Sequence, residues 1–502
     1  MQIGDSSSET TSSSELSQKQ QDHLTVPEPH HPNDEYTPNT SASATTPTTT
    51  EDEDLKDHKK KSPLPHSPRR KLSGRLGHLF HPSPRHAKQP GDTRGDSSAS
   101  IESSASESSS TGAKISRSFG NLFAHSSWRK HLQHHHLHHH QHQEEPCSPF
   151  ADVPRLAEKY GDYVKPAKPS GKNSGATNKH NIGSGATAVI RLVQPPDHGP
   201  ILAVKEFMKR EKNEDQREYM KRMHNEYCIS KTASGHPNIV ATKDLVLDEH
   251  DRWCSVMEYC DGGDLFSLLT ERPNLSLMEQ ACLFKQLLLG LQHLHHLGIA
   301  HRDIKPENLC LTAGGTLKIA DFGVADVVQT CFEREPHSCY KWCGSEPFWS
   351  PEMWTLKDAE TAYDGRALDV WSAAITYFCI RFQTLPFSNA FYTEHPCKAP
   401  PEGASTGSPA AVAAQAADGG DPAFRKYIQQ RKEDPMQCDL WRQPDGTMMA
   451  EEERECLSHM LDPNPETRWT IDQIVECPWV QKVEMCNDGE LPNGWRHYHC
   501  CK

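Results

Sequence analysis

The chain has no run of about eighteen consecutive apolar residues, so no membrane-spanning helix is expected. Its start also lacks the charged segment followed by an apolar core that defines a secretory signal, and none is predicted. Because Gln2 follows Met1, the usual N-myristoylation motif is missing as well. These absences favour a cytoplasmic protein whose contact with a membrane, if any, is peripheral.

Positive charge is also in short supply. Asp and Glu number 68 against 54 Lys and Arg, which gives a formal net charge of −14. A general nucleic-acid-binding protein would be basic over its folded part, so no nucleic-acid partner is predicted. The 17 cysteines lack the regular spacing of a disulfide framework. Without a secretory signal they are interpreted as reduced thiols.

Apolar residues make up only 34% of the chain, and the shortage is concentrated before about Asn178. A stretch this rich in Ser, Thr, Pro, His and charge cannot bury enough apolar surface to offset the entropy of ordering its backbone. We therefore predict a disordered regulatory region over 1–177, a folded domain over 178–482 and a tail over 483–502. An Ala-, Gly-, Pro- and Ser-rich insertion at about 393–420 is also predicted to be disordered.

Two features stand out in the first region. The segments 71–80 and 114–123 both fit the pattern K-[LI]-S-x-x-[LF]-G-x-L-F. We interpret them as docking segments for a partner protein or for the folded domain, with a duplicated linker without a role as the alternative. Eight of the twelve residues from His131 to His142 are histidine. A solvated low-complexity run is favoured over a metal site for this tract.

The folded domain begins with strand patterns and continues with helical ones. A three-strand start is predicted up to Lys205, followed by a charged helix over Glu214–Thr232 and strands over Ile239–Leu247 and Trp253–Glu258. The later elements are all predicted to be helices. The first begins at a capping box formed by Ser276 and Glu279 and ends at Gly298. The others are a buried helix over Leu368–Phe382, a helix that begins at about Phe424 and a last helix over Ile471–Lys482. A small strand-rich lobe followed by a larger helical lobe is an α+β architecture.

Two strings carry the chemistry. The first is His301-Arg-Asp303-Ile-Lys305-Pro-Glu-Asn308, and the second, Asp321-Phe-Gly323, begins thirteen residues after Asn308. They resemble the catalytic loop and the metal-binding motif of eukaryotic-type protein kinases at every fixed position. An unrelated chain would rarely contain both at this spacing. The resemblance implies a bilobal kinase fold over about 178–482.

The resemblance also implies roles for these residues. Asp303 would accept or orient the proton of a substrate hydroxyl, and Lys305 would offset charge on the transferred phosphoryl group. Asn308 and Asp321 would hold Mg²⁺. A lysine two residues after the aspartate is typical of serine/threonine kinases, in which Ser345 would then lie against Asp303 and Lys305. The expected substrates are protein serine and threonine hydroxyls.

The same resemblance places ATP between the lobes. Gly183-Ser-Gly185-Ala-Thr-Ala188-Val-Ile190 is similar to the kinase glycine-rich loop, with Ala188 replacing the third glycine. Lys205 would contact the α- and β-phosphates and pair with Glu226. The segment from Val256 to Asp264 resembles the hinge between the two kinase lobes. The full set of expected ATP-binding residues runs along the first strands, this hinge and the floor of the cleft: Ile182, Gly183, Ser184, Gly185, Ala186, Thr187, Ala188, Val189, Ile190, Ala203, Lys205, Glu258, Cys260, Asp264 and Cys310.

The resemblance to protein kinases implies three further contacts that support the site. Glu352 should pair with Arg468, and Asp369 should cap the backbone of the catalytic loop. Arg302, which precedes the catalytic aspartate, is expected to bind an anion from the segment between Asp321 and Glu352. The candidate anions are phosphorylated Thr330, Ser338 or Tyr340, and unmodified Glu333 or Glu335.

Within the kinase superfamily the chain is similar to the fungal halotolerance and nitrogen-permease-reactivator kinases. The shared features include Met257-Glu-Tyr-Cys260, the insertion after Phe387, Trp479 to Cys486 and the His-rich ending. The resemblance implies action on plasma-membrane ion or nutrient transporters. Two alternatives stay open: a pseudokinase scaffold, and a serine/threonine kinase of another signalling branch. A third hypothesis makes the N-terminal region the main functional element.

Overall fold

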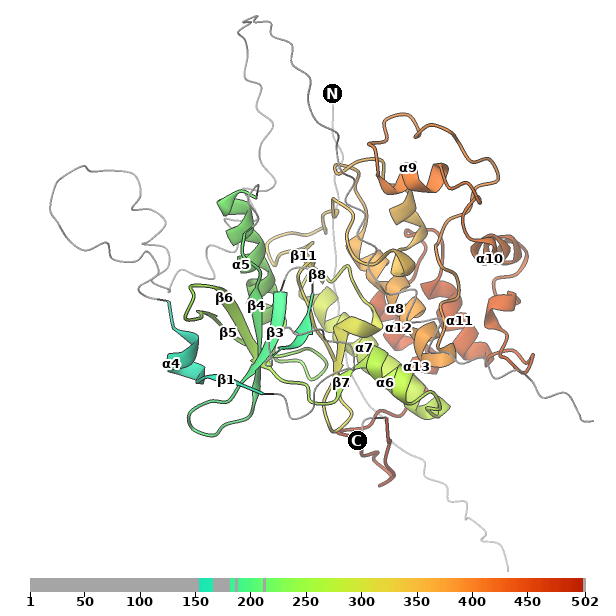
Figure 1. Cartoon of the computed structure of the whole chain (residues 1–502). Coiled ribbons are helices and arrows are strands. Elements are labelled where there is room, and N and C mark those ends of the chain that lie inside the picture. Colours follow the sequence, from blue (N-terminus) through green and yellow to red (C-terminus); the bar gives the residue numbers. More distant parts are fainter. Residues whose placement is uncertain (1–152, 166–180, 186–187, 211–213, 500–502) are drawn as a thin grey trace, which may run out of the picture. The chain divides into compact units, whose positions relative to one another are not determined.

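The computed structural model describes residues 153–165, 181–185, 188–210 and 214–499 (Figure 1). The repeats 71–80 and 114–123 and the histidine tract lie outside the described residues. Within the described part, strands β1–β6 gather with helix α5 in one lobe and helices α6–α13 gather in the other (Figure 1). The predicted bilobal α+β architecture is confirmed.

The small lobe is built on an antiparallel sheet of six strands, ordered β1-β3-β4-β6-β5 with β2 paired to β3. Every residue of the central β4 strand is buried. Helix α5 begins after Asp215, whose carboxylate accepts hydrogen bonds from the Arg217 and Glu218 N–H groups. The bounds are β1 Tyr163–Val164, β2 Asn181–Ser184, β3 Ala188–Val193, β4 Leu202–Phe207, α5 Gln216–Ala233, β5 Thr242–Leu247 and β6 Trp253–Glu258.

The ordered small lobe starts earlier than predicted. Residues 153–165 fall in the region predicted to be disordered, yet they form helix α4 (Leu156–Tyr160) and strand β1. Leu156 and Tyr160 pack into an apolar cluster with residues of β3, β4, β5 and β6. The four-residue spacing of these two side chains puts both on the buried face of α4. The predicted boundary at 178 is therefore wrong for 153–165.

The large lobe surrounds the long helices α7 and α8. Ser276 and Glu279 form the predicted capping box at the start of α7, and α8 is buried on nearly all sides. The predicted last helix is divided by Pro478, which begins α13. The helices are α6 Leu265–Glu271, α7 Leu277–His296, α8 Gly365–Phe382, α9 Pro409–Ala414, α10 Pro422–Glu433, α11 Glu451–Met460, α12 Ile471–Glu476 and α13 Pro478–Lys482. None of the helices in the described ranges is long and apolar enough to cross a membrane.

Short strands and 3₁₀ turns connect these helices and form the floor of the site. Strand β9 pairs with β7 and with β10, and β11 pairs with β8. Their bounds are β7 Gly263–Asp264, β8 Ile299–Ala300, η2 Pro306–Asn308, β9 Leu309–Leu311, β10 Leu317–Ile319, β11 Asp326–Val327, η3 Glu346–Phe348, η4 Pro351–Thr355 and η5 Asp439–Trp441.

The insertion at about 393–420 is ordered, contrary to the prediction. It contains α9, whose first turn is capped by the side chain of Ser408. The backbone N–H groups of Ser405 and Ala410 donate to the carbonyls of Lys357 and Leu356. Ser408 and Ala411 are buried. Small side chains let the segment lie close to the backbone next to η4, so a low content of large apolar residues did not mean disorder here.

The predicted tail also folds back onto the large lobe. The Thr316 hydroxyl donates to the Asp488 carboxylate at 2.9 Å, and the Tyr498 N–H donates to the Glu279 carboxylate at 2.8 Å. Cys486, Leu491, His497 and His499 are buried. Residues 483–499 are therefore part of the folded lobe.

Candidate active site

The loop 301–308 is positioned by a single buried carboxylate. Asp369 of α8 is fully buried and accepts hydrogen bonds from the His301 and Arg302 N–H groups, both at 2.7 Å. Asp369 also contacts His295, whose Nε2 atom lies 3.0 Å from the carboxylate. Arg302 has the left-handed backbone conformation, with a φ of 66°. Such strain persists only where surrounding contacts over-determine it, and Asp369 supplies those contacts.

Three polar side chains meet at the predicted catalytic aspartate. The Ser345 hydroxyl donates to Asp303 Oδ1 at 2.9 Å, and Lys305 Nζ donates to Asp303 Oδ2 at 2.8 Å and to Ser345 Oγ at 2.7 Å. Asn308 Nδ2 donates to the Asp303 carbonyl at 2.8 Å and to its carboxylate at 3.0 Å. Asp303 is thus held by cationic and neutral donors, and one of its oxygens already accepts a hydroxyl.

The predicted phosphate-binding lysine bridges the two lobes. Lys205 Nζ forms an ion pair with Glu226 of α5 and another, 2.8 Å long, with Asp321. Burial opposes ionisation of both Lys205 and Asp321. The attraction of Glu226 and then of Asp321 outweighs it for Lys205, and the attraction of Lys205 outweighs it for Asp321. The pKa of Lys205 is raised and the pKa of Asp321 is lowered. Both groups therefore carry their charges at neutral pH.

The segment around Asp321 is tightly fitted. A side chain at Gly323 would approach Asp321 Oδ1 to 3.2 Å and Glu226 Oε2 to 3.3 Å, so glycine leaves room for the ion pairs. Asp321 itself is left-handed, with a φ of 63°. His301 stacks edge-on against Phe322, and its Nε2 lies 3.0 Å from the Ala320 carbonyl. These contacts couple the metal-binding motif to the catalytic loop.

The residues predicted to bind ATP lie along the first strands and the hinge. β2 and β3 form the hairpin of the glycine-rich loop, with Gly183 opposite Ile190 and Ser184 opposite Val189. Ala203 of β4 lies opposite Met257 of β6. Ala186 and Thr187 fall outside the described residues. The hairpin also contains Ile182, Gly185 and Ala188.

The hinge and the floor of the cleft contribute the remaining predicted contacts. Cys260 lies against Cys310 of β9, and the interaction between the thiols, together with burial, raises the pKa of Cys260. Glu258 accepts a hydrogen bond from the Ala241 N–H and pairs with Lys318. Asp264 caps α6 by accepting from the Ser267 N–H at 2.7 Å. The predicted contact of Asp264 with the ribose of ATP requires that the carboxylate bind the ribose and cap α6 at the same time.

The protein kinase domain family matches residues 176–480 of the chain. The chain belongs to the protein kinase family. Its kinase domain is of the serine/threonine type and is similar to the fungal halotolerance and nitrogen-permease-reactivator group.

Three fungal relatives illustrate this similarity. The serine/threonine-protein kinase hal4 of Schizosaccharomyces pombe is 35% identical over 66% of this chain and 48% of the relative. The serine/threonine-protein kinase HAL4/SAT4 of Saccharomyces cerevisiae is 33% identical over 61% and 46%. The nitrogen permease reactivator protein of the same yeast is 32% identical over 64% and 41%. The chain thus spans less than half the length of each of these relatives.

The kinase domain holds its predicted structural ion pair in a buried setting. Arg468 donates to both oxygens of Glu352, at 2.7 and 2.9 Å, and also to the Ala367 and Asp462 carbonyls. The Arg468 side chain has no exposed surface and lies over the Trp371 ring. The pair joins the end of the activation segment, which we define as the residues from Asp321 to Glu352, to α8 and to the loop before α12.

Replacement of Glu352 by alanine is expected to lower the free energy of unfolding by about 3–5 kcal/mol, because it leaves a buried guanidinium without its counter-charge. Urea denaturation of the purified chain measures the loss. Glu394→Ala is the matched control, since Glu394 pairs with Arg425 at the surface. The control should lose less than about 1 kcal/mol. Equal losses in the two variants would show that the buried pair has no special importance.

Arg302 already has partners in this structure. It donates to the Val324 carbonyl at 2.8 Å and to the Tyr363 hydroxyl at 3.0 Å, and it lies 3.8 Å from Asp326. Neither Tyr363 nor Asp326 was identified from the sequence, because no spacing rule links them to the catalytic loop. Ser338 is exposed, and the idea that its phosphate binds Arg302 stays a prediction.

Proposed function

We propose that this protein transfers the γ-phosphate of ATP to serine and threonine hydroxyls of other proteins. The observation that carries the proposal is the assembled set of contacts around Lys205 and Asp303. Kinase catalysis needs the lysine–glutamate ion pair and the metal-binding aspartate to be in place together. Lys205 touches Glu226 and Asp321 at once. A scaffold that only binds partners would not need this arrangement.

The catalytic loop supports the acceptor side of the reaction. Asp303 Oδ1 accepts the Ser345 hydroxyl in this structure, which indicates that the carboxylate can hold and orient a substrate alcohol in the same way. Lys305 lies beside it and would offset negative charge on the phosphoryl group during transfer. Ser345 links the activation segment to both residues, so a displaced activation segment would disturb the acceptor site.

The opposite side of the cleft fits a magnesium–ATP complex. About half of the Asp321 side chain, 51%, is exposed, and the carboxylate is held ionised by Lys205. The Asn308 amide nitrogen donates to Asp303, which leaves the amide oxygen to bind a cation. Carboxylate and amide oxygens, together with phosphate oxygens, are the ligands that Mg²⁺ prefers. When bound, Mg²⁺ would neutralise charge between the β- and γ-phosphates.

We further propose that the substrates include plasma-membrane ion or nutrient transporters. The support is the similarity of the kinase domain to the halotolerance kinases and to the nitrogen permease reactivator protein. Transfer from ATP to the cytosolic parts of such transporters would take place in the cytoplasm, with peripheral association at the membrane. A serine/threonine kinase of another signalling branch is the second candidate. The segments 71–80 and 114–123 remain proposed docking sites for a partner.

The local charge near the acceptor site favours basic substrates. Glu307 follows the catalytic lysine by two positions, and burial raises its pKa. Its Oε2 atom is buried without a hydrogen-bond partner among the described residues. A basic side chain of a substrate peptide beside this carboxylate would offset its negative charge. Glu307 is therefore proposed to select basic residues before the acceptor, with Asp264 adding negative charge.

Phosphorylation of a peptide library by the purified chain tests both activity and preference. The parent should phosphorylate serine and threonine peptides that carry basic residues before the acceptor. Glu307→Gln should lower kcat/KM for those peptides by about 10-fold or more and leave alanine-containing peptides nearly unchanged. Glu402→Gln, at an exposed position in the insertion, is the control. An unaltered position profile in Glu307→Gln would rule out the proposed selection.

A further inference from the structure

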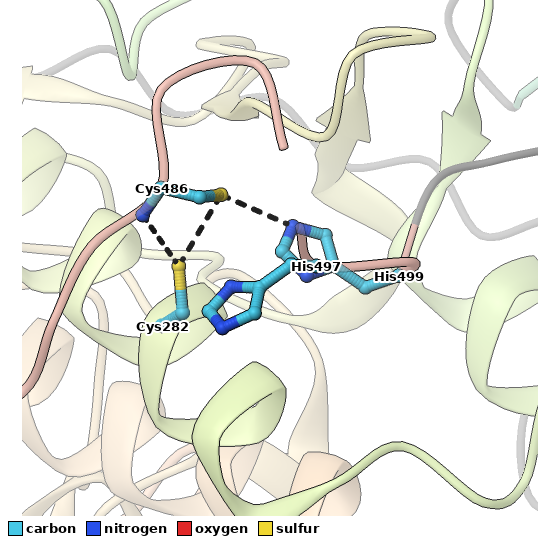
Figure 2. Close-up of side chains that lie close together, drawn as sticks. All are labelled: Cys282, Cys486, His497 and His499. Carbon is cyan, nitrogen blue, oxygen red and sulfur yellow. Dashed lines mark hydrogen bonds between the residues drawn. The ribbon is translucent and has the colours of Figure 1, made fainter. Parts of the chain in front are cut away.

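Two cysteines and two histidines converge where the C-terminal segment meets helix α7. Cys282 comes from the second turn of α7, Cys486 follows α13, and His497 and His499 stand near the end of the described residues (Figure 2). All four are buried, and their ligand atoms lie within 4.8 Å of one another. This cluster, Cys282–Cys486–His497–His499, has no part in the kinase active site described above.

The distances within the cluster suit a tetrahedral metal ion. Cys282 Sγ lies 3.5 Å from Cys486 Sγ, and the His499 ring lies beside the second sulfur, with Nε2 3.7 Å from it. Ligands of a tetrahedral zinc ion, with bonds of about 2.3 Å to sulfur and about 2.0–2.1 Å to nitrogen, stand roughly 3.3–3.8 Å apart. The sulfurs are too far apart for a disulfide bond, which is about 2.05 Å long.

His497 gives an independent indication of a ligand. The residue is only 5% exposed, and neither ring nitrogen has a hydrogen-bond partner in the part of the chain that the structure describes. A buried imidazole left in that state loses its hydrogen bonds to water without replacement. Figure 2 shows its ring beside the other three side chains of the cluster. A metal ion within the cluster would satisfy one of these nitrogens.

Other polar groups around the cluster form hydrogen bonds with its side chains. Gln286 Nε2 donates to Cys282 Sγ at 3.4 Å, and the Cys486 N–H donates to the same sulfur at 3.3 Å. His499 Nε2 donates to the Gly315 carbonyl at 3.0 Å, so the nitrogen left to bind an ion is Nδ1, which is buried and has no hydrogen-bond partner among the described residues. Hydrogen bonds of this kind orient the ligand side chains, and the bond to Gly315 fixes which nitrogen of His499 carries the proton. Leu491 packs with the two cysteines in one apolar cluster.

We propose that Cys282, Cys486, His497 and His499 bind one structural zinc ion. Two thiolates and two imidazoles form a ligand set that selects zinc over hard cations such as Mg²⁺ or Ca²⁺. Four protein ligands leave no open position, so the site is closed and supports folding rather than catalysis. It is held by residues 204 positions apart in the sequence, Cys282 and Cys486.

The proposed ion would fasten the C-terminal segment to the catalytic lobe. Gln286 links the cluster to the chain that leads to Asp321, because its Oε1 atom accepts from the Leu317 N–H at 2.7 Å and from Asn238 at 3.3 Å. The nearby contacts of Asp488 and Tyr498 belong to the same interface. Metal binding therefore stabilises residues 483–499 and the packing of α7 against β10.

Metal analysis of the full chain, purified without a histidine tag, tests the proposal. The parent should retain about one more equivalent of zinc than Cys282→Ser/Cys486→Ser. Both proteins contain the 131–142 histidine tract, so metal bound there cancels in the difference. The matched control is His395→Ala/Cys397→Ser, which replaces an exposed cysteine and histidine in the insertion. The control should keep the parental zinc content.

Cobalt substitution gives a second readout that does not depend on a variant. Parent protein reconstituted with Co²⁺ should show a thiolate-to-cobalt charge-transfer band and visible bands typical of tetrahedral coordination. A histidine tract cannot produce the thiolate band.

A strong chelator should lower the Tm of the parent by about 5 °C or more and leave the Tm of Cys282→Ser/Cys486→Ser nearly unchanged. Equal zinc content in parent and double variant, absence of the thiolate band, or a Cys282–Cys486 disulfide found by peptide mapping would each overturn the proposal.

Discussion

Asp303→Asn is expected to lower kcat by about 10²- to 10⁴-fold while the protein stays folded. The carboxylate accepts the Ser345 hydroxyl and the Lys305 ammonium group in the structure. An amide of the same size keeps one oxygen acceptor but cannot take a proton from the substrate hydroxyl. The Lys305 ammonium group also loses its counter-charge. Rates of phosphate transfer at saturating ATP and peptide measure the effect.

The matched control for this variant is Asp358→Asn. Asp358 is a surface carboxylate whose hydrogen bonds to described residues lie within its own turn, to Glu360 and Thr361. It should leave kcat unchanged. Circular dichroism and the Tm of Asp303→Asn should match those of the parent closely. A well-folded Asp303→Asn protein that transfers phosphate at the parental rate would show that Asp303 is not the catalytic carboxylate.

Asp321→Asn is expected to weaken the binding of magnesium–nucleotide by at least about 10-fold. Asp321 is the carboxylate proposed to hold Mg²⁺, and it also pairs with Lys205 at 2.8 Å. The amide would be a weaker ligand for the cation and would leave Lys205 with Glu226 as its remaining counter-charge. Isothermal titration of ADP with and without Mg²⁺ separates the two contributions.

The two catalytic-site variants should differ in kind. Asp303→Asn should bind magnesium–ADP nearly as tightly as the parent, because Asp303 contacts the acceptor side of the cleft. Asp321→Asn should lose most of the gain in affinity that Mg²⁺ gives to the parent. If Mg²⁺ improved ADP binding equally in parent and Asp321→Asn, the assignment of Asp321 as a metal ligand would be wrong.

The catalytic part of the site was accessible to sequence reasoning because its residues cluster in short strings. Asp303, Lys305 and Asn308 lie within one loop, and Asp321 follows at a fixed distance. Lys205 and Glu226 are farther apart, but strand and helix patterns place them on facing elements. The contacts of Arg302 with Tyr363 and Asp326 are different, because these residues come close to Arg302 only when the large lobe has folded. No local sequence pattern predicts such contacts.

Composition was a less reliable guide at the edges of the domain. The short helix α4 and strand β1 contribute Leu156 and Tyr160 to the core, although they lie within a polar region. The insertion folds because Ser408 and Ala411 are small enough to lie against η4. The cysteine–histidine cluster could not be found in the sequence at all, because Cys282 and its partners meet only after the large lobe has folded.

The claim that this chain is an active serine/threonine kinase is tested most directly by identifying the phosphorylated amino acid. The purified chain is incubated with ATP, Mg²⁺ and a library containing serine, threonine and tyrosine peptides, with Asp303→Asn as the blank. The account predicts phosphoserine and phosphothreonine well above the blank and no phosphotyrosine. Transfer no greater than that of Asp303→Asn, or transfer mainly to tyrosine, would contradict it.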